Sequence, residues 1–163
     1  MPWYLINVTV HVFAAVIWLG GMFFFALVGA PVIRKVASAE LRIQLFRQLG
    51  EQFRTIGWIC IATLLATGVL NLYFRGFLSH AVLTSVTFWQ TRFGVALLWK
   101  LIAVASMLIV QAIHDFSVGP AASRVQPGTL QALSLRRRAA LLARASAIIG
   151  IVVVIAAVKL ARG

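Results

Sequence analysis

Acidic residues and cysteine are the scarcest chemistry in this sequence. Its 163 residues include 3 Asp and Glu side chains against 15 Lys and Arg, so the net charge at pH 7 is +12. Cys60 is the single cysteine, which excludes an internal disulfide and a metal site made of paired cysteines. The few carboxylates form no acid–base pair, and the sequence has no hydrolytic triad or phosphate-binding loop. These absences exclude the hydrolases and phosphoryl-transfer enzymes that depend on such motifs.

Hydrophobic residues make up 62% of the chain, and the mean hydropathy is +0.99. A soluble domain of this size could not bury so much apolar surface, so the surroundings of the chain are lipid. In a soluble protein, a net charge of this size would suggest nucleic acid. Here the basic residues cluster between apolar runs, and anionic lipid headgroups explain them better. The lipid bilayer is therefore the expected partner, and nucleic acid is not.

Four apolar stretches are long enough to cross a bilayer, which takes about 20 residues per helix. The first, from Trp3 to Ile33, carries no charged side chain, and no basic segment or cleavage site marks its start as a signal peptide. We therefore predict an all-α, integral-membrane four-helix bundle that forms one domain over residues 1–163, without an internal repeat. The predicted spans cover about residues 3–30, 55–75, 92–115 and 139–160.

Lysine and arginine are distributed unequally between the two sides of these spans. Four lie on the side of the chain ends, namely Arg75, Arg92, Lys159 and Arg162. Ten lie in or next to the connections after spans 1 and 3, namely Arg34, Lys35, Arg42, Arg47, Arg54, Arg124, Arg136, Arg137, Arg138 and Arg144. Because basic connections stay in the cytoplasm, we predict that both termini face outward from a bacterial cytoplasmic membrane, which the chain crosses several times.

The connection between spans 1 and 2 contains a helical pattern of its own. Ser38 is a typical N-cap residue, and Glu40 follows in what would be the first turn. Apolar residues then recur at helical spacing, at Leu45, Leu49, Phe53 and Ile56. This pattern predicts an amphipathic cytoplasmic helix that lies on the inner leaflet before the chain enters span 2.

Two ionisable side chains lie inside the predicted spans. His11 in span 1 and Lys100 in span 3 are each eight residues past an aromatic or basic residue that marks the start of the helix. The two spans run in the same direction, so both side chains lie ~12 Å below the outer ends of their helices. An imidazole and an ammonium are costly in hydrocarbon and usually have a function there. We predict that both line one outward-facing cavity, together with Trp18 and Asn71.

Structural roles are the alternatives for these two residues. His11 could be a core histidine that bonds Asn71 or a backbone carbonyl, and Lys100 could extend toward the membrane surface. If His11 instead binds a cofactor, its other ring nitrogen is expected to bond a neighbour such as Asn7 or Asn71, because ligating histidines are usually held in this way.

Copper and haem b are the two candidate cofactors. Copper(I) prefers thiolate and thioether ligands, and no Met or Cys pair has ligand spacing. A copper site would therefore have to draw on His11, Met22, Met107 or His114. A haem needs one or two axial side chains in an apolar slot and cations near its propionates, which suits His11 and Lys100. His114 ends span 3 beside Asp115, and a helix-end role is otherwise expected for it.

Short motifs in spans 1 and 3 resemble a known family. Span 1 contains His11-x6-Trp18-x-Gly20-Gly21, and span 3 contains Leu97-Leu98-Trp99-Lys100-Leu101. Both motifs resemble the copper-resistance D family of membrane proteins, which has small members with four helices. They also resemble the related, haem-dependent bacterial protoporphyrinogen IX oxidase family. The resemblance implies that the functional histidine of helix 1 and lysine of helix 3 in that family correspond to His11 and Lys100.

The resemblance implies copper handling or homeostasis at the cytoplasmic membrane. One alternative is a haem b protein that transfers electrons or oxidises a porphyrinogen, which would be a haem-dependent oxidoreductase if it is an enzyme. Another is a cofactor-free structural subunit of a membrane complex. The sequence leaves open whether the chain forms a homo-oligomer or binds other subunits.

Overall fold

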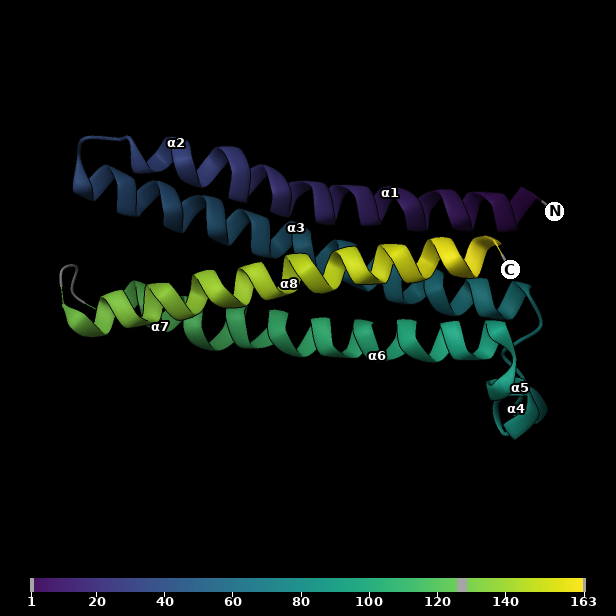
Figure 1. The fold of residues 1–163 in the computed structure, drawn as a ribbon. Helices are drawn as coiled ribbons and strands as arrows, with labels where there is room; N and C mark the ends of the chain where they lie inside the picture. Colours follow the sequence, from purple (N-terminus) through teal and green to yellow (C-terminus); the bar gives the residue numbers. More distant parts are fainter. Residues whose placement is uncertain (1, 126–128, 163) are drawn as a thin grey trace. The chain divides into compact units, whose positions relative to one another are not determined.

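The structure, a computed structural model, describes residues 2–125 and 129–162. Most of these residues are helical, and no strand lies among them (Figure 1). Four stretches are long and apolar enough to cross a membrane, namely Pro2–Arg34, Ala39–Phe74, Arg92–Ala122 and Leu130–Lys159. This confirms the predicted all-α fold with four spans in a multi-pass membrane protein. Each stretch extends past its predicted span by at least one turn on the side of the basic connections.

The chain divides into two compact halves, Met1–Thr84 and Ser85–Gly163. In the first half, the first long helix packs against the second one in the manner of a hairpin (Figure 1). Its elements are α1 (Pro2–Phe24), η1 (Phe25–Gly29), α2 (Ala30–Arg34), α3 (Ala39–Phe74) and α4 (His80–Leu83). The structure describes each half by itself, so the single domain and the bundle stay predictions.

The second half is a helical hairpin of the same kind. The long helix α6 packs along α8, and η2 and α7 also contact α8. The elements of this half are α5 (Val86–Gln90), α6 (Arg92–Ala112), η2 (Ile113–Val118), α7 (Gly119–Arg124) and α8 (Leu130–Arg162). Thr129 caps the start of α8, because its hydroxyl accepts a hydrogen bond from the Ala132 N–H at 3.1 Å.

Proline accounts for the wider turns in the first long helix of each half. A proline inside a helix lacks an N–H and its ring collides with the carbonyl four residues earlier. Ahead of Pro31 the Ala30 N–H donates to the Phe25 carbonyl, and ahead of Pro120 the Gly119 N–H donates to that of His114. These bonds reach back five residues, so the wider π-turns η1 and η2 carry the helix past each proline. Span 1 therefore continues beyond Pro31, where the sequence predicted its end.

The two halves repeat one order of elements. Each has a long helix, a π-helix, a short helix containing a proline, and a second long helix. Pro120 lies 89 positions after Pro31 (120 minus 31), and this offset relates the bounds of the four pairs of elements to within two residues. Corresponding positions seldom hold the same residue, since His11 corresponds to Lys100 and Trp18 to Met107. The order of the helices is therefore repeated, although the amino-acid sequence shows no such repeat.

The amphipathic stretch between spans 1 and 2 is helical, and Ser38 caps it as expected. The Ser38 hydroxyl accepts from the Leu41 N–H at 3.2 Å. The stretch is continuous with span 2, because α3 runs without a break over 36 residues. A helix of that length extends ~54 Å, more than the ~30 Å hydrocarbon core. The stretch is therefore the N-terminal part of α3, where the sequence suggested a separate helix on the membrane surface.

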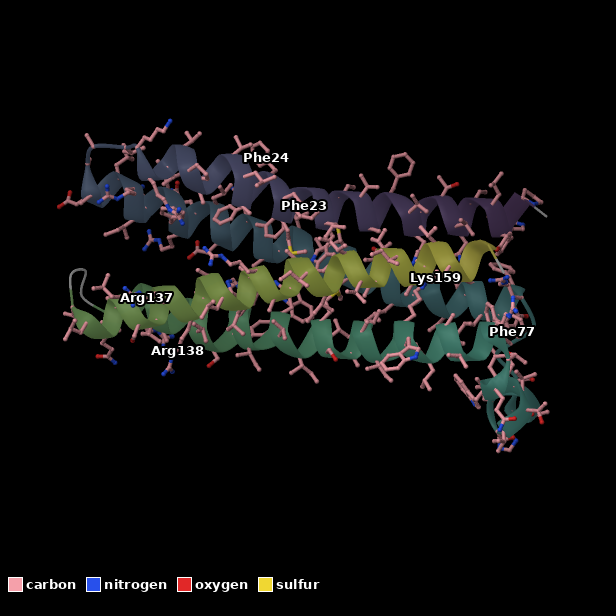
Figure 2. All side chains as sticks on the ribbon, in the orientation of Figure 1. Phe23, Phe24, Phe77, Arg137, Arg138 and Lys159 are labelled. Carbon is pink, nitrogen blue, oxygen red and sulfur yellow. The ribbon has the colours of Figure 1, made fainter. Side chains whose placement is uncertain are left out.

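Hydrophobic side chains cover the outward faces of these helices. Phe13 is 63% exposed and Leu27 is 72% exposed, and Figure 2 shows Phe24 pointing away from α3. Faces of this kind contact lipid tails when a helix crosses a bilayer. In α8, Arg137 and Arg138 lie near the start of the helix and Lys159 lies near its other end (Figure 2). No charged side chain lies between Arg144 and Lys159.

Candidate functional site

His11 lies on the face of α1 that packs against α3. Asn7, Ala14 and Trp18 are buried on the same stripe, at helical spacing from the half-buried His11. The His11 ring nitrogen Nδ1 lies 2.7 Å from the Thr67 hydroxyl oxygen Oγ1. This places the imidazole between α1 and α3, at a level where α3 offers a polar side chain.

The direction of the hydrogen bond between His11 and Thr67 follows from the other contact of the hydroxyl. Thr67 Oγ1 lies 2.6 Å from the Thr63 carbonyl, which only accepts, so the single hydroxyl proton is used there. The hydroxyl oxygen can then accept from His11, an arrangement that requires the ring proton on Nδ1. In that arrangement the neutral imidazole would have its lone pair on Nε2, the nitrogen through which it could bind a metal.

Asn7 lies one turn from His11 and links α1 to the same threonine. Its amide nitrogen Nδ2 donates to the Thr67 carbonyl at 3.0 Å and to Asn71 Oδ1 at 2.9 Å. Asn7 is 7% exposed, and a buried amide in an apolar helix pair needs such partners. The neighbour at Nδ1 of His11 is thus Thr67, where the sequence suggested Asn7 or Asn71.

Trp18 is 4% exposed and packs on the α3 backbone at Gly57. A Cβ at Gly57 would lie 3.7 Å from the Trp18 ring atom Cδ1 and 3.8 Å from Nε1. The indole N–H has no hydrogen-bond partner among the described residues. A buried donor of this kind is costly in hydrocarbon, and it marks this level of the helix pair as a place where a ligand atom would find a donor.

Lys100 lies on α6 in the second half, at the position that corresponds to His11. It is half-buried, and the described residues of its own half give its ammonium no hydrogen bond or ion pair. The polar residues around His11 have apolar counterparts in this half, since Asn7 corresponds to Ala96 and Thr67 to Ala156. The cavity that His11 and Lys100 are expected to share stays a prediction.

The predicted metal-binding residues occupy different levels of their helices. Met22 lies eleven residues after His11, which is about 16 Å along α1, and His114 lies seven residues after Met107, about 10 Å along the second half's first span. Neither pair can hold one ion. Within the part of the chain that the structure describes, no group of three His, Cys, Asp or Glu side chains comes together.

His114 and Asp115 form a pair within the π-turn η2. Asp115 is 6% exposed, and its Oδ1 lies 2.7 Å from the His114 nitrogen Nδ1. Gln111 Nε2 donates to the other carboxylate oxygen at 2.8 Å. The sequence predicted a role at a helix end for His114. The structure places the residue in a widened turn, where its ring is held by the neighbouring carboxylate.

Thr67 is the residue whose role the sequence does not predict. Helical rise places it in the same layer as His11 and Asn71, but threonines in membrane helices commonly pack or bond their own backbone. The available signal is its spacing, because Thr67 lies one turn before Asn71 on the polar stripe of α3. A stripe alone does not say which of its members faces the imidazole.

Comparison with known proteins assigns the chain to a family. The family described as Copper resistance protein D matches residues 47–160, a region that begins in α3 and follows the helix of His11. An uncharacterized protein of Aquifex aeolicus (strain VF5) is 34% identical over 64 residues, which are 39% of this chain and 43% of that protein. The chain thus spans less than half the length of this relative. No solved structure matches the chain. Since the family match covers well over half of its residues, the chain belongs to the copper resistance protein D family.

Proposed function

We propose that this protein handles copper at the bacterial cytoplasmic membrane and that His11 is the residue through which it binds the metal. The observation that carries the proposal is the contact between His11 Nδ1 and the Thr67 hydroxyl, which favours the tautomer with its lone pair on Nε2. Membership of the copper resistance protein D family supports copper as the metal. Copper is the cargo in this proposal rather than a resident cofactor.

The donor set fits a loosely held ion better than a fully enclosed one. Imidazole nitrogen and thioether sulfur are both ligands of copper, but Met22 lies about 16 Å from His11 along α1. The described residues of the first half therefore provide one oriented ligand at this level. An ion with one strong protein ligand can be passed on, which is what a protein that moves or delivers copper requires.

A haem b protein is the second candidate, and His11 as a single protein ligand also favours it. Haem iron needs only one or two axial side chains, and a neutral histidine held at its other nitrogen is a common one. We propose Lys100 as the cation for an anionic group of the ligand, such as a propionate, because an ammonium in a span needs a counter-charge. If this candidate holds, the activity is electron transfer or the oxidation of a porphyrinogen.

An absorption spectrum of the purified chain, taken before and after reduction and followed by titration with copper(I), tests both candidates. We expect copper binding by the wild-type protein and its loss in His11→Ala. Val12→Ala is the matched control, because Val12 is 53% exposed on the same helix. A reduced-minus-oxidised α band that disappears in His11→Ala would select haem. A protein with neither ligand, or a His11→Ala variant that keeps its ligand, would overturn the proposal and favour a structural subunit.

A further inference from the structure

We propose that Thr67 is a positioning residue for His11, and that its hydroxyl keeps the imidazole in the tautomer with the proton on Nδ1. The inference rests on the proposed function, because it explains why Nε2 is the nitrogen that binds the metal. Thr67 lies on α3 and contacts the histidine, whereas the metal contacts only His11 in this proposal.

The two short contacts of the hydroxyl leave one arrangement of protons. If the ring proton were on Nε2, the unprotonated Nδ1 would face Thr67 Oγ1 at 2.7 Å and would need the hydroxyl proton. That proton would then be missing from the 2.6 Å contact with the Thr63 carbonyl, where two oxygen acceptors would face each other. The arrangement with Nδ1–H satisfies both contacts. In hydrocarbon no water replaces a lost bond, so this difference is not screened.

The surroundings of Thr67 hold it at the level of the ring. Asn7 donates to the Thr67 carbonyl and to Asn71, which joins α1 to α3 one turn away from the histidine. On the same side, a Cβ at Gly68 would lie 3.8 Å from His11 Cε1, so the ring edge lies against the α3 backbone. The imidazole is thus held by a hydrogen bond and by a backbone surface, and its rotation is restricted.

The second half of the chain is an internal control for this role. Its corresponding residues are Lys100 in place of His11 and Ala156 in place of Thr67, and its two long helices also pack against each other. The hairpin therefore packs without a polar residue at this position of its second helix. An ammonium has three equivalent donors and no tautomers. The threonine occurs in the half that has an imidazole to orient.

Solid-state ¹⁵N NMR of the metal-free, full-length protein in lipid, with labelled histidine, tests the inference. The His11 signals are identified by their absence in His11→Ala. We expect wild type and Thr67→Ser to show a protonated Nδ1 and an unprotonated Nε2, because serine keeps the hydroxyl. Thr67→Val keeps the volume and removes the acceptor, so we expect its Nε2 to be protonated in a large share of molecules. Thr63→Val is the matched control, since the Thr63 hydroxyl donates to the Ile59 carbonyl at 2.9 Å.

Binding of copper(I) to wild type, Thr67→Ser, Thr67→Val and Thr63→Val provides the second measurement. Loss of a group that orients a ligating histidine typically weakens metal binding by about 10–100-fold. We expect that loss in Thr67→Val, with Thr67→Ser and Thr63→Val close to wild type. An unprotonated Nδ1 in the wild-type protein, or a Thr67→Val variant with unchanged tautomer, would overturn the inference. A wild type that binds no metal would overturn the proposed function instead, because the tautomer is measured without metal.

Discussion

At the scale of residues, the first half satisfies the polar groups it places in an apolar setting. An unbonded polar group costs several kcal/mol in hydrocarbon, roughly 2–7 kcal/mol by transfer measurements. Asn7, His11 and Thr67 meet this demand through one another and through α3 carbonyls. Trp18 is the exception among the described residues of that half, since its buried N–H has no partner. The Trp18 N–H is therefore a donor that a bound ligand could use, in addition to the Nε2 lone pair proposed for His11.

Lys100 provides a prediction at this scale. Lys100→Met keeps much of the side-chain length and removes the charge, so we expect weaker binding of any ligand that carries a carboxylate or propionate. The variant should also unfold at a higher temperature without ligand, because the ammonium no longer lies in an apolar span. Ligand titration and thermal unfolding in detergent measure the two effects. Lys159→Met is the control at the exposed end of α8. If Lys100→Met binds such a ligand with unchanged affinity, Lys100 does not neutralise its anionic group.

His114 provides a second prediction. His114→Ala removes the ring that bonds Asp115 at 2.7 Å, and we expect the free energy of unfolding to fall by about 1 kcal/mol. The ligand should stay bound, because His11 and not His114 is proposed to hold it. His80→Ala, at an exposed residue of α4, should change neither quantity. Loss of all bound copper or haem in His114→Ala would show that the site lies at the other end of the spans.

At the scale of elements, the lengths of the helices and the repeat were not predictable from the sequence. The apolar runs located the four spans, since charge-free stretches of that length are typical of helices that cross a bilayer. They did not show that α3 continues through its amphipathic start, because both a surface helix and a longer span have period 3.6. Nor did they show the π-turns, which depend on how the backbone accommodates Pro31 and Pro120 within longer helices.

The start of α6 provides a prediction for this scale. The Thr91 hydroxyl caps the helix at Gly94, and α5 folds back so closely that a Cβ at Gly94 would collide with the Phe88 carbonyl. We expect Gly94→Ala to lower the free energy of unfolding by about 1–3 kcal/mol, as overpacking does. Gly50→Ala is the matched control, because nothing lies within 4 Å of its added Cβ, and it should be neutral or stabilising. Equal unfolding temperatures for the two variants would contradict this packing.

At the scale of the whole molecule, the sequence was sufficient to predict the class of the protein and, within the candidate site, the residue His11. Composition and charge-free runs were sufficient for an all-α membrane protein, and the depth of His11 followed from helical rise. The partner of His11 did not follow, because it depends on the rotation of α1 against α3. The prediction that Lys100 shares the cavity concerns the other half of the chain and needs its own experiment.

The orientation of the spans in the membrane is the prediction for this scale. Ten Lys and Arg on one side against four on the other predict that both termini lie outside. In a Cys60→Ala background, Gln90→Cys should react with an impermeant thiol reagent in intact cells. Ser134→Cys should react only after the membrane is opened. Both positions are exposed in the structure. The reverse pattern would place both termini in the cytoplasm.

The central claim is that His11 binds the metal, and the copper and iron content of the purified protein tests it most directly. Elemental analysis of wild type, Val12→Ala and His11→Ala, purified side by side from cells grown with added copper, gives the metal bound per chain. We predict bound metal in the first two proteins, with copper in excess of iron, and its loss in His11→Ala. Equal metal content in all three proteins would contradict the claim.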